Sequence, residues 1–264
     1  MSVGGRRGAD VEPGRRWWDD DGWSPSDGSG TVRVIDSWLV DEGRVRGLDR
    51  HARRFGEACS RFSGPGTAGF LRAVAESLPA RGRWFPRVEL VETGSRERLR
   101  LWLRPAPPRT TTVRLWDSGP DRRTLPAVKG VDLDHLTALR AAAVAAGADE
   151  ALLLSSGGHV LEGSTTSLVW WRGDALCGPP PGPGLLSGVT RALLGELAGR
   201  PVVPESATPA ELADVPVWTV NALHGIRPVA GGLGRFLEED AAEAERWQAR
   251  LESLAVPAVP ALFT

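Results

Sequence analysis

The fold of the second half of the chain is indicated by one stretch, Gly147-Ala148-Asp149-Glu150-Ala151-Leu152-Leu153-Leu154-Ser155-Ser156-Gly157-Gly158-His159-Val160-Leu161-Glu162-Gly163-Ser164. A Leu- and Ala-rich segment before it, 132–146, predicts a helix, and Gly147 is typical of the residue that follows a helix end. Residues 150–154 predict a strand, 155–158 a tight turn and 159–162 the partner strand. Glu162 is therefore expected at the end of a strand, at a glycine-containing bend.

Further elements are predicted on both sides of this hairpin. Upstream, we expect strands at 31–40, 88–92, 98–104 and 110–115, and helices at 48–62 and 68–78. Downstream, the pattern predicts a hairpin over 167–177, a helix from 190 to about 198, a strand at 215–220 and a long amphipathic helix at 236–254. Thr208-Pro209-Ala210-Glu211 has the composition of a helix start with a capping box.

These elements divide the chain into four parts. Residues 1–30 form a Trp-, Gly- and Asp-rich N-terminal extension, 31–118 a small α+β domain, 119–128 a polar interdomain segment, and 129–264 the larger domain. The extension carries the cluster Trp17-Trp18-Asp19-Asp20-Asp21-Gly22-Trp23 between flanks that are typical of disorder. We expect these tryptophans to dock onto the body of the protein or onto a partner.

Composition excludes several classes of function. The chain has 264 residues, a net charge of −1 and 41% hydrophobic residues, so neither nucleic acid nor an anionic membrane is an expected partner. Two distant cysteines, Cys59 and Cys177, and four scattered histidines show no metal-site spacing, and no metal is expected. No apolar run has the length of a membrane span and the N-terminus has no signal-peptide core, so we expect a cytoplasmic protein.

Lys129 is the only lysine, because the other 31 of the 32 Lys and Arg residues are arginine. An amine can lose its proton and attack a carbonyl, whereas a guanidinium stays protonated. A Schiff base is the chemistry that requires this distinction. A surface lysine that escaped a compositional bias is the alternative interpretation, and the neighbouring segments must decide between the two.

Four segments of the second half offer groups that act together. Residues 128–130 present the Lys129 amine beside a glycine, and residues 161–165 present the Glu162 carboxylate at a strand end. Residues 186–191 open a helix whose free N–H groups can bind an anion, and residues 221–229 begin at a strand end with more N–H groups. An amine, a carboxylate and a phosphate cradle are what pyridoxal 5′-phosphate requires.

These segments resemble the class IV aminotransferase family, the fold-type IV pyridoxal-phosphate enzymes, which includes branched-chain and D-amino-acid aminotransferases and 4-amino-4-deoxychorismate lyase. The motifs that carry the resemblance are 147–154, 160–164 and 186–191, within a match over roughly 32–230. The resemblance implies a small α+β N-terminal domain, a larger C-terminal domain with a barrel-like sheet, and a cofactor in the cleft. It also implies a homodimer whose substrate pockets are completed across the interface.

The resemblance also implies a role for each matching residue. Lys129 matches the catalytic lysine that forms the Schiff base and moves the substrate proton, and Glu162 matches the partner of the pyridine nitrogen. The expected phosphate ligands are the helix start at Gly188, Val189 and Thr190, the loop at Asn221 and Ala222, and Arg54 of the segment His51-Ala52-Arg53-Arg54-Phe55.

Three departures from the family pattern leave the reaction open. The tyrosine that many members carry five residues after the lysine is Asp134 here, and the chain has no tyrosine at all. Asp36-Ser37 stands where the lyase group carries threonines, and Ala222 replaces a threonine of the phosphate loop, a feature that points to the aminodeoxychorismate lyase-like branch.

We therefore weigh three functions. The first is an aminotransferase that acts on an amino acid and a 2-oxo acid through Lys129. The second is a lyase that releases 4-aminobenzoate and pyruvate from an amino-chorismate-like substrate. The third is a non-catalytic homologue that is used for binding. The substrate carboxylate has five candidate anchors: Arg96, Arg98, Arg122, Arg123 and Arg227.

Overall fold

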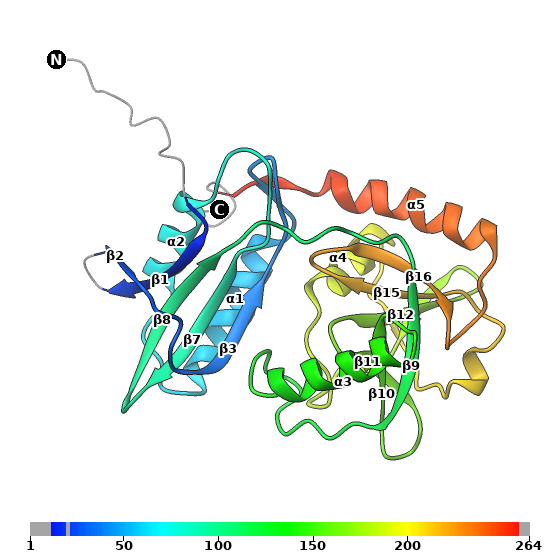
Figure 1. The fold of residues 1–264 in the computed structure, drawn as a ribbon. Coiled ribbons are helices and arrows are strands. Elements are labelled where there is room, and N and C mark those ends of the chain that lie inside the picture. The colour runs from blue at the N-terminus through cyan, green and yellow to red at the C-terminus, as the bar shows by residue number, and fades with distance from the viewer. Residues whose placement is uncertain (1–11, 20–21, 259–264) are drawn as a thin grey trace. The chain divides into compact units, whose positions relative to one another are not determined.

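The computed structural model describes residues 12–19 and 22–258 and divides the chain into two compact units. The first unit is Met1–Pro107 with Ala255–Thr264, and the second is Pro108–Leu254. Figure 1 shows the elements of each unit, and each is described by itself below. Within the described ranges, every helix is too short or too polar to span a membrane.

The first unit is built on a five-stranded antiparallel sheet in the order β2-β1-β8-β7-β3. Its strands are β1 (Gly14–Asp19), β2 (Gly22–Pro25), β3 (Thr31–Ser37), β7 (Arg87–Thr93) and β8 (Arg96–Leu103). The N-terminal extension thus contributes a hairpin that pairs with β8 at the sheet edge. Trp17 is only 6% exposed, which confirms the expected docking, whereas residues 1–11, 20 and 21 lie outside the described residues.

Two helices, α1 (Leu48–Ser60) and α2 (Ala68–Ser77), lie against one face of this sheet (Figure 1). Phe70 of α2 is fully buried, and its ring centroid lies 6.2 Å from Phe55 of α1 and 6.4 Å from Trp18 of β1. A second small sheet has the order β17-β5-β4-β6. Its strands are β4 (Val40–Asp41), β5 (Arg44–Val45), β6 (Arg83–Trp84) and β17 (Val256–Pro257).

The second unit is a closed six-stranded barrel. The order is β11-β10-β9-β16-β15-β12, and β11 pairs back with β12. The strands are β9 (Val113–Pro120), β10 (Glu150–Leu154), β11 (Val160–Gly163), β12 (Ser167–Arg172), β15 (Val217–Asn221) and β16 (Gly225–Gly231). Two short strands, β13 (Ala175–Gly178) and β14 (Val203–Pro204), continue the sheet beyond β12. The predicted α+β unit followed by a barrel-like sheet is confirmed.

Apolar side chains fill both sides of the barrel wall because successive side chains of a strand point to opposite faces. On β12, Leu168 and Trp170 belong to one core cluster and Val169 to the other. The second cluster also contains side chains of α4 (Val189–Leu197) and α5 (Glu238–Ser253), so these helices cover the outer wall. The third helix, α3 (Leu133–Ala145), joins the parallel strands β9 and β10.

The barrel closes at a single residue pair, Glu162 with Ser167. The turn between them is tight, and Gly163 N donates to Thr166 O at 2.9 Å. The buried carboxylate of Glu150 stabilises this turn. Its Oε1 accepts hydrogen bonds from Thr165 N at 2.5 Å and from Thr166 Oγ1 at 3.1 Å. Closure of the sheet is therefore supported by a buried side chain of the neighbouring strand β10.

The observed units differ from the expected domain limits in two places. Residues 113–118, expected in the small domain, belong to β9 of the barrel because β9 pairs in parallel with both β10 and β16. Residues 255–258, expected in the large domain, return to the first unit, where β17 pairs with β5. The expected helix start at Thr208 forms its capping box with Glu211, but the helix is only the 3-10 turn Ala210–Leu212.

We expect Gly163→Ala to destabilise the second unit. A Cβ at this position would lie 2.7 Å from Glu150 Oε1 and closer still to Thr166 Oγ1, and both groups are held in place by hydrogen bonds. Overpacking of this kind costs about 1–3 kcal/mol. Urea unfolding would measure the loss, and Gly182→Ala, where a Cβ meets nothing within 4 Å, should unfold like the wild type. Equal loss in both variants would contradict this account of the turn.

Candidate functional site

Most of the predicted site residues lie around one end of the barrel. Glu162 of β11 pairs with Ser167 of β12, which pairs in turn with Val220 of β15. Asn221 is the next residue on β15 and its last one. Lys129 lies in the loop before α3, and its charge acts on the Glu162 carboxylate, so the two groups are close in space.

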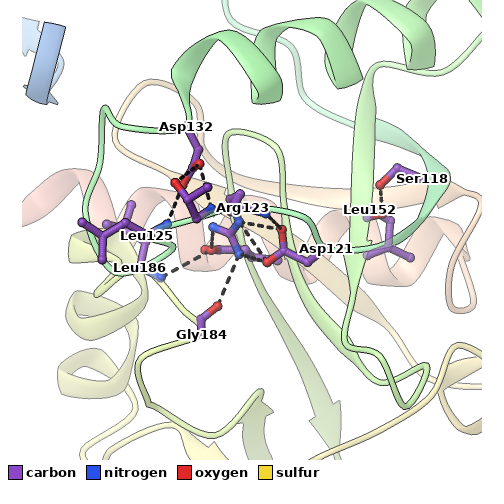
Figure 2. A network of polar contacts seen from close by, with 10 residues as sticks. Ser118, Asp121, Arg123, Leu125, Asp132, Leu152, Gly184 and Leu186 are labelled. Carbon is purple, nitrogen blue, oxygen red and sulfur yellow. Dashed lines mark hydrogen bonds and ion pairs between the residues drawn. The ribbon is translucent and has the colours of Figure 1, made fainter.

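Glu162 is buried, with 5% of its surface exposed, and its carboxylate accepts hydrogen bonds from Arg123 and Leu186, both of which are labelled in Figure 2. The Arg123 guanidinium donates from Nη1 to Oε1, and the backbone N–H of Leu186 donates to the same oxygen at 3.3 Å. Burial raises the pKa of Glu162 above its usual value, although Arg123, Leu186 N and the charge of Lys129 all act against that rise. The site thus contains a carboxylate whose ionisation depends on its hydrogen-bond donors.

Arg123 is a member of the site that the sequence named only as one of five candidate anchors. Its Nε lies 3.0 Å from both carboxylate oxygens of Asp121, and its Nη2 donates to Asp121 Oδ2 at 2.8 Å. Nη2 also reaches Gly184 O at 3.3 Å, and the side chain is only 4% exposed. Nothing in the sequence separates Arg123 from the neighbouring Arg122, because only the fold brings one of them to Glu162.

The start of α4 supplies a second feature, next to the seam of the barrel. Gly188 is the N-cap residue of this helix, and no side chain caps its first turn. The first N–H groups of an α-helix have no partner within the helix, so this end can bind an anion. A Cβ at Gly188 would overlap Ser167 Oγ, so glycine lets the helix start approach the seam. Val189 and Thr190, the other two predicted residues, are buried.

The Asn221 side chain shapes the turn between β15 and β16. Its Oδ1 accepts from the N–H groups of Leu223 at 3.1 Å and His224 at 2.8 Å. Asn221 therefore organises the loop that includes Ala222. Burial and the charges of Arg227, Arg140 and Arg109 lower the pKa of His224 to about 4, so the imidazole is neutral at pH 7.

Arg54 lies in the first unit, where it binds a buried acid. Its Nε and Nη2 donate to the two oxygens of Asp36 at 2.8 and 2.9 Å, and His51 Nδ1 lies 2.8 Å from Asp36 Oδ1. The positively charged neighbours hold the pKa of Asp36 well below its usual value despite complete burial. The expected contact of Arg54 with a phosphate stays a prediction.

Two further polar groups bear on the site. The Arg227 guanidinium binds Glu150 Oε2 at 3.2 Å and Thr110 Oγ1 at 3.1 Å, so it helps to hold the barrel seam. Its role as a carboxylate anchor stays a prediction. Ser164, two residues after Glu162, is 5% exposed, and its Oγ has no hydrogen-bond partner among the described residues. The sequence did not identify this hydroxyl as a site group. Over residues 12–19 and 22–258, no three His, Cys, Asp or Glu side chains could hold a metal ion.

We expect Arg123→Gln to raise the pKa of Glu162 further. Arg123 is the cation closest to the buried carboxylate, and a neighbouring opposite charge lowers a carboxyl pKa by about 1–3 pH units. A carboxyl-detected NMR titration of the cofactor-free protein would follow Glu162 directly. Arg122→Gln is the matched control, because Arg122 is exposed, and its Glu162 should titrate as in the wild type. A Glu162 pKa unchanged by Arg123→Gln would refute the role of the ion pair.

Comparisons with known proteins establish the family and the fold of the chain. A family model described as amino-transferase class IV matches residues 33–231 of the chain. No curated protein matches the sequence.

Several solved structures share the fold. The branched-chain aminotransferase of the thermophilic archaeon Thermoproteus uzoniensis, solved with norvaline, has a TM-score of 0.72 at 19% identity and covers 92% of this chain and 99% of its own. A hypothetical aminotransferase from Mycobacterium tuberculosis in its PLP-bound form has a TM-score of 0.73 at 22% identity, with 90% and 99% covered. A Legionella pneumophila protein, whose assignment as a 4-amino-4-deoxychorismate lyase is itself a proposal, has a TM-score of 0.69 at 20% identity, with 86% and 96% covered. At these identities the similarity shows the fold.

Proposed function

Since the chain belongs to the class IV aminotransferase family, whose members use pyridoxal 5′-phosphate, we propose that it is an aminotransferase that acts on an amino acid and a 2-oxo acid. The observation that carries the proposal is a buried carboxylate at one end of the barrel, Glu162, whose pKa burial raises and the charge of the single lysine acts to lower. Burial and an adjacent charge shift the pKa values of ionisable groups, and such shifts are typical of active sites. The reaction class rests on these residues as well as on the family.

The residues of the barrel end fit the three parts of the cofactor. Lys129 would supply the amine for the covalent link, and the buried carboxylate of Glu162 would hold the pyridine nitrogen in its protonated form. The start of α4, where no side chain caps the helix, offers N–H groups for the phosphate, and the Asn221–Ala222 loop is the second proposed phosphate contact. When bound, the cofactor supplies an electron sink for the charge that develops on the substrate α-carbon.

Glu162 and Lys129 would have different roles in the reaction because one is an acid and the other an amine. Glu162 must be ionised to accept a hydrogen bond from a protonated nitrogen, and Arg123 favours that ionised form in a buried position. Lys129 would remove the proton from the substrate α-carbon and return it, because it is the only lysine of the chain and a primary amine can act as a general base. Val128, which is 4% exposed, anchors the backbone next to it.

Asp36 favours the aminotransferase over the lyase. It stands where the lyase group carries threonines, but its carboxylate is completely buried and accepts bonds from Arg54 and His51. An acid that is held ionised by two partners is a poor proton donor. Lyase chemistry, which Ala222 favours through the family resemblance, is the alternative. A homodimer and a cytoplasmic location remain expectations of the same proposal.

Lys129→Arg tests the covalent link. We expect the purified wild type to be yellow and to retain the cofactor on Lys129 after borohydride treatment, while the variant stays colourless although its charge is unchanged. Peptide mass spectrometry would locate the label without ambiguity, because the α-amino group of the N-terminus is the only other primary amine of the chain. A wild type that remains colourless with added cofactor would refute the enzyme assignment.

The reaction itself can be separated by its products. An aminotransferase should convert the bound cofactor to its amine form on mixing with an amino acid, and a 2-oxo acid should restore the yellow form. Pyruvate released from aminodeoxychorismate without any amino acceptor would instead establish the lyase. Rapid-mixing absorbance and a coupled pyruvate assay measure the two outcomes on the same preparation.

A further inference from the structure

The loop that carries Lys129 is closed by one carboxylate, that of Asp132 (Figure 2). Asp132 Oδ1 accepts from Thr124 N and from Thr124 Oγ1, each at 2.8 Å, and Oδ2 accepts from Leu125 N at 3.0 Å. These three bonds tie Asp132 to Thr124, eight positions earlier, and to Leu125, seven positions earlier. They close the base of a loop, called the loop neck below, and Lys129 lies between its two ends. Asp132 is 9% exposed, and the neck is therefore shielded from water.

The direction of these bonds distinguishes Asp132 from an ordinary helix cap. Asp132 is the N-cap residue of α3, where an aspartate usually accepts from the N–H of the second or third helical residue. Here its side chain makes no bond of that kind and turns back to residues 124 and 125. The carboxylate therefore orders the loop rather than the helix.

The rest of the loop has few ways to move once the neck is closed. Val128 N donates to Leu125 O at 2.9 Å, and Leu133 N donates to Gly130 O at 3.0 Å, so turns lie on both sides of Lys129. Val128 is buried, and Gly130 has a φ of 133°, which favours glycine. On the upstream side the neck continues into Arg123, whose side chain is fixed on Asp121 and Glu162.

From this geometry we propose that Asp132 is a positioning residue for Lys129: its carboxylate closes the loop 124–132 and so limits the positions that the lysine can take relative to Glu162. The inference deepens the proposed function, since it assumes that Lys129 carries the chemistry. Its physical reason is that a base on a flexible side chain acts efficiently only when its backbone is fixed relative to the acceptor and the substrate.

Two variants and a matched control test the proposal. Asp132→Ala removes all three bonds, and Thr124→Val removes only the hydroxyl bond without a change of shape. Asp134→Asn removes a carboxylate from the first turn of the same helix, but Asp134 is exposed and outside the loop neck. The control therefore matches the loss of charge near the helix start without opening the loop.

The first measurement is the rate at which Lys129 is acylated in the cofactor-free protein. The label is easy to assign because Lys129 is the only lysine of the chain. Acylation of Lys129 by an amine-reactive ester, followed by peptide mass spectrometry, should be several-fold faster in Asp132→Ala than in the wild type and unchanged in Asp134→Asn. Amide hydrogen exchange should lose protection within 124–132 and keep it in the barrel strands. Unchanged acylation and exchange in a folded Asp132→Ala would overturn the inference whether or not the proposed function holds.

The second measurement uses the cofactor-loaded enzyme. We expect kcat to fall by about 10- to 100-fold in Asp132→Ala with KM nearly unchanged, since misplacement of a catalytic group by about 1 Å has effects of this size. If Asp132→Ala fails to fold, Thr124→Val decides, with a smaller loss of kcat and a smaller gain in acylation rate expected in parallel. Wild-type kcat in both variants would refute the positioning role.

Discussion

Closure of the barrel at Glu162 and Ser167 is the constraint on which the other features depend. Only one residue pair joins β11 to β12, and the turn between them is held by the Glu150 carboxylate, which binds Thr165 and Thr166 on one side and Arg227 on the other. Loss of one partner of such a buried ion pair costs about 3–5 kcal/mol, more than a typical backbone hydrogen bond contributes. The same seam brings Glu162, Ser164 and the start of α4 together, so the stability of the barrel and the geometry of the site have a common cause.

The second consequence of closure is electrostatic. Glu162 is removed from water at the seam, and the fold provides Arg123, Leu186 N and the nearby Lys129 to oppose the desolvation. Arg123 is itself fixed by Asp121, and Asp132 closes the adjacent loop. The carboxylates of Asp121, Glu162 and Asp132 each accept hydrogen bonds from this region and so fix the backbone of the loop that contains Lys129. This is the kind of support that a catalytic group on a loop requires.

In the first unit, tryptophan and arginine side chains pack against each other on the five-stranded sheet. The chain has 11 tryptophans and no tyrosine, and β1 places Trp17 in the sheet with the guanidinium carbons of Arg98 and Arg100 4.3 and 4.9 Å from its ring centroid. Arginine stacks on an indole while its polar groups stay hydrated or paired, as Arg100 pairs with Glu89. The N-terminal hairpin is thereby part of the sheet.

The sequence by itself determined the local elements and the family to which the chain belongs. The period of apolar residues, the glycine after α3 and the hairpin around 155–158 correspond to helices and strands within a few residues, because these signals are local. The single lysine and Glu162 stay the predicted reactive pair. The sequence could not determine that β9 belongs to the barrel, that 255–258 return to the first unit, or that Arg123 rather than Arg122 binds Glu162. Those outcomes are decided by which strands pair across long separations and by which buried charge needs a partner, and only the tertiary structure brings such groups together.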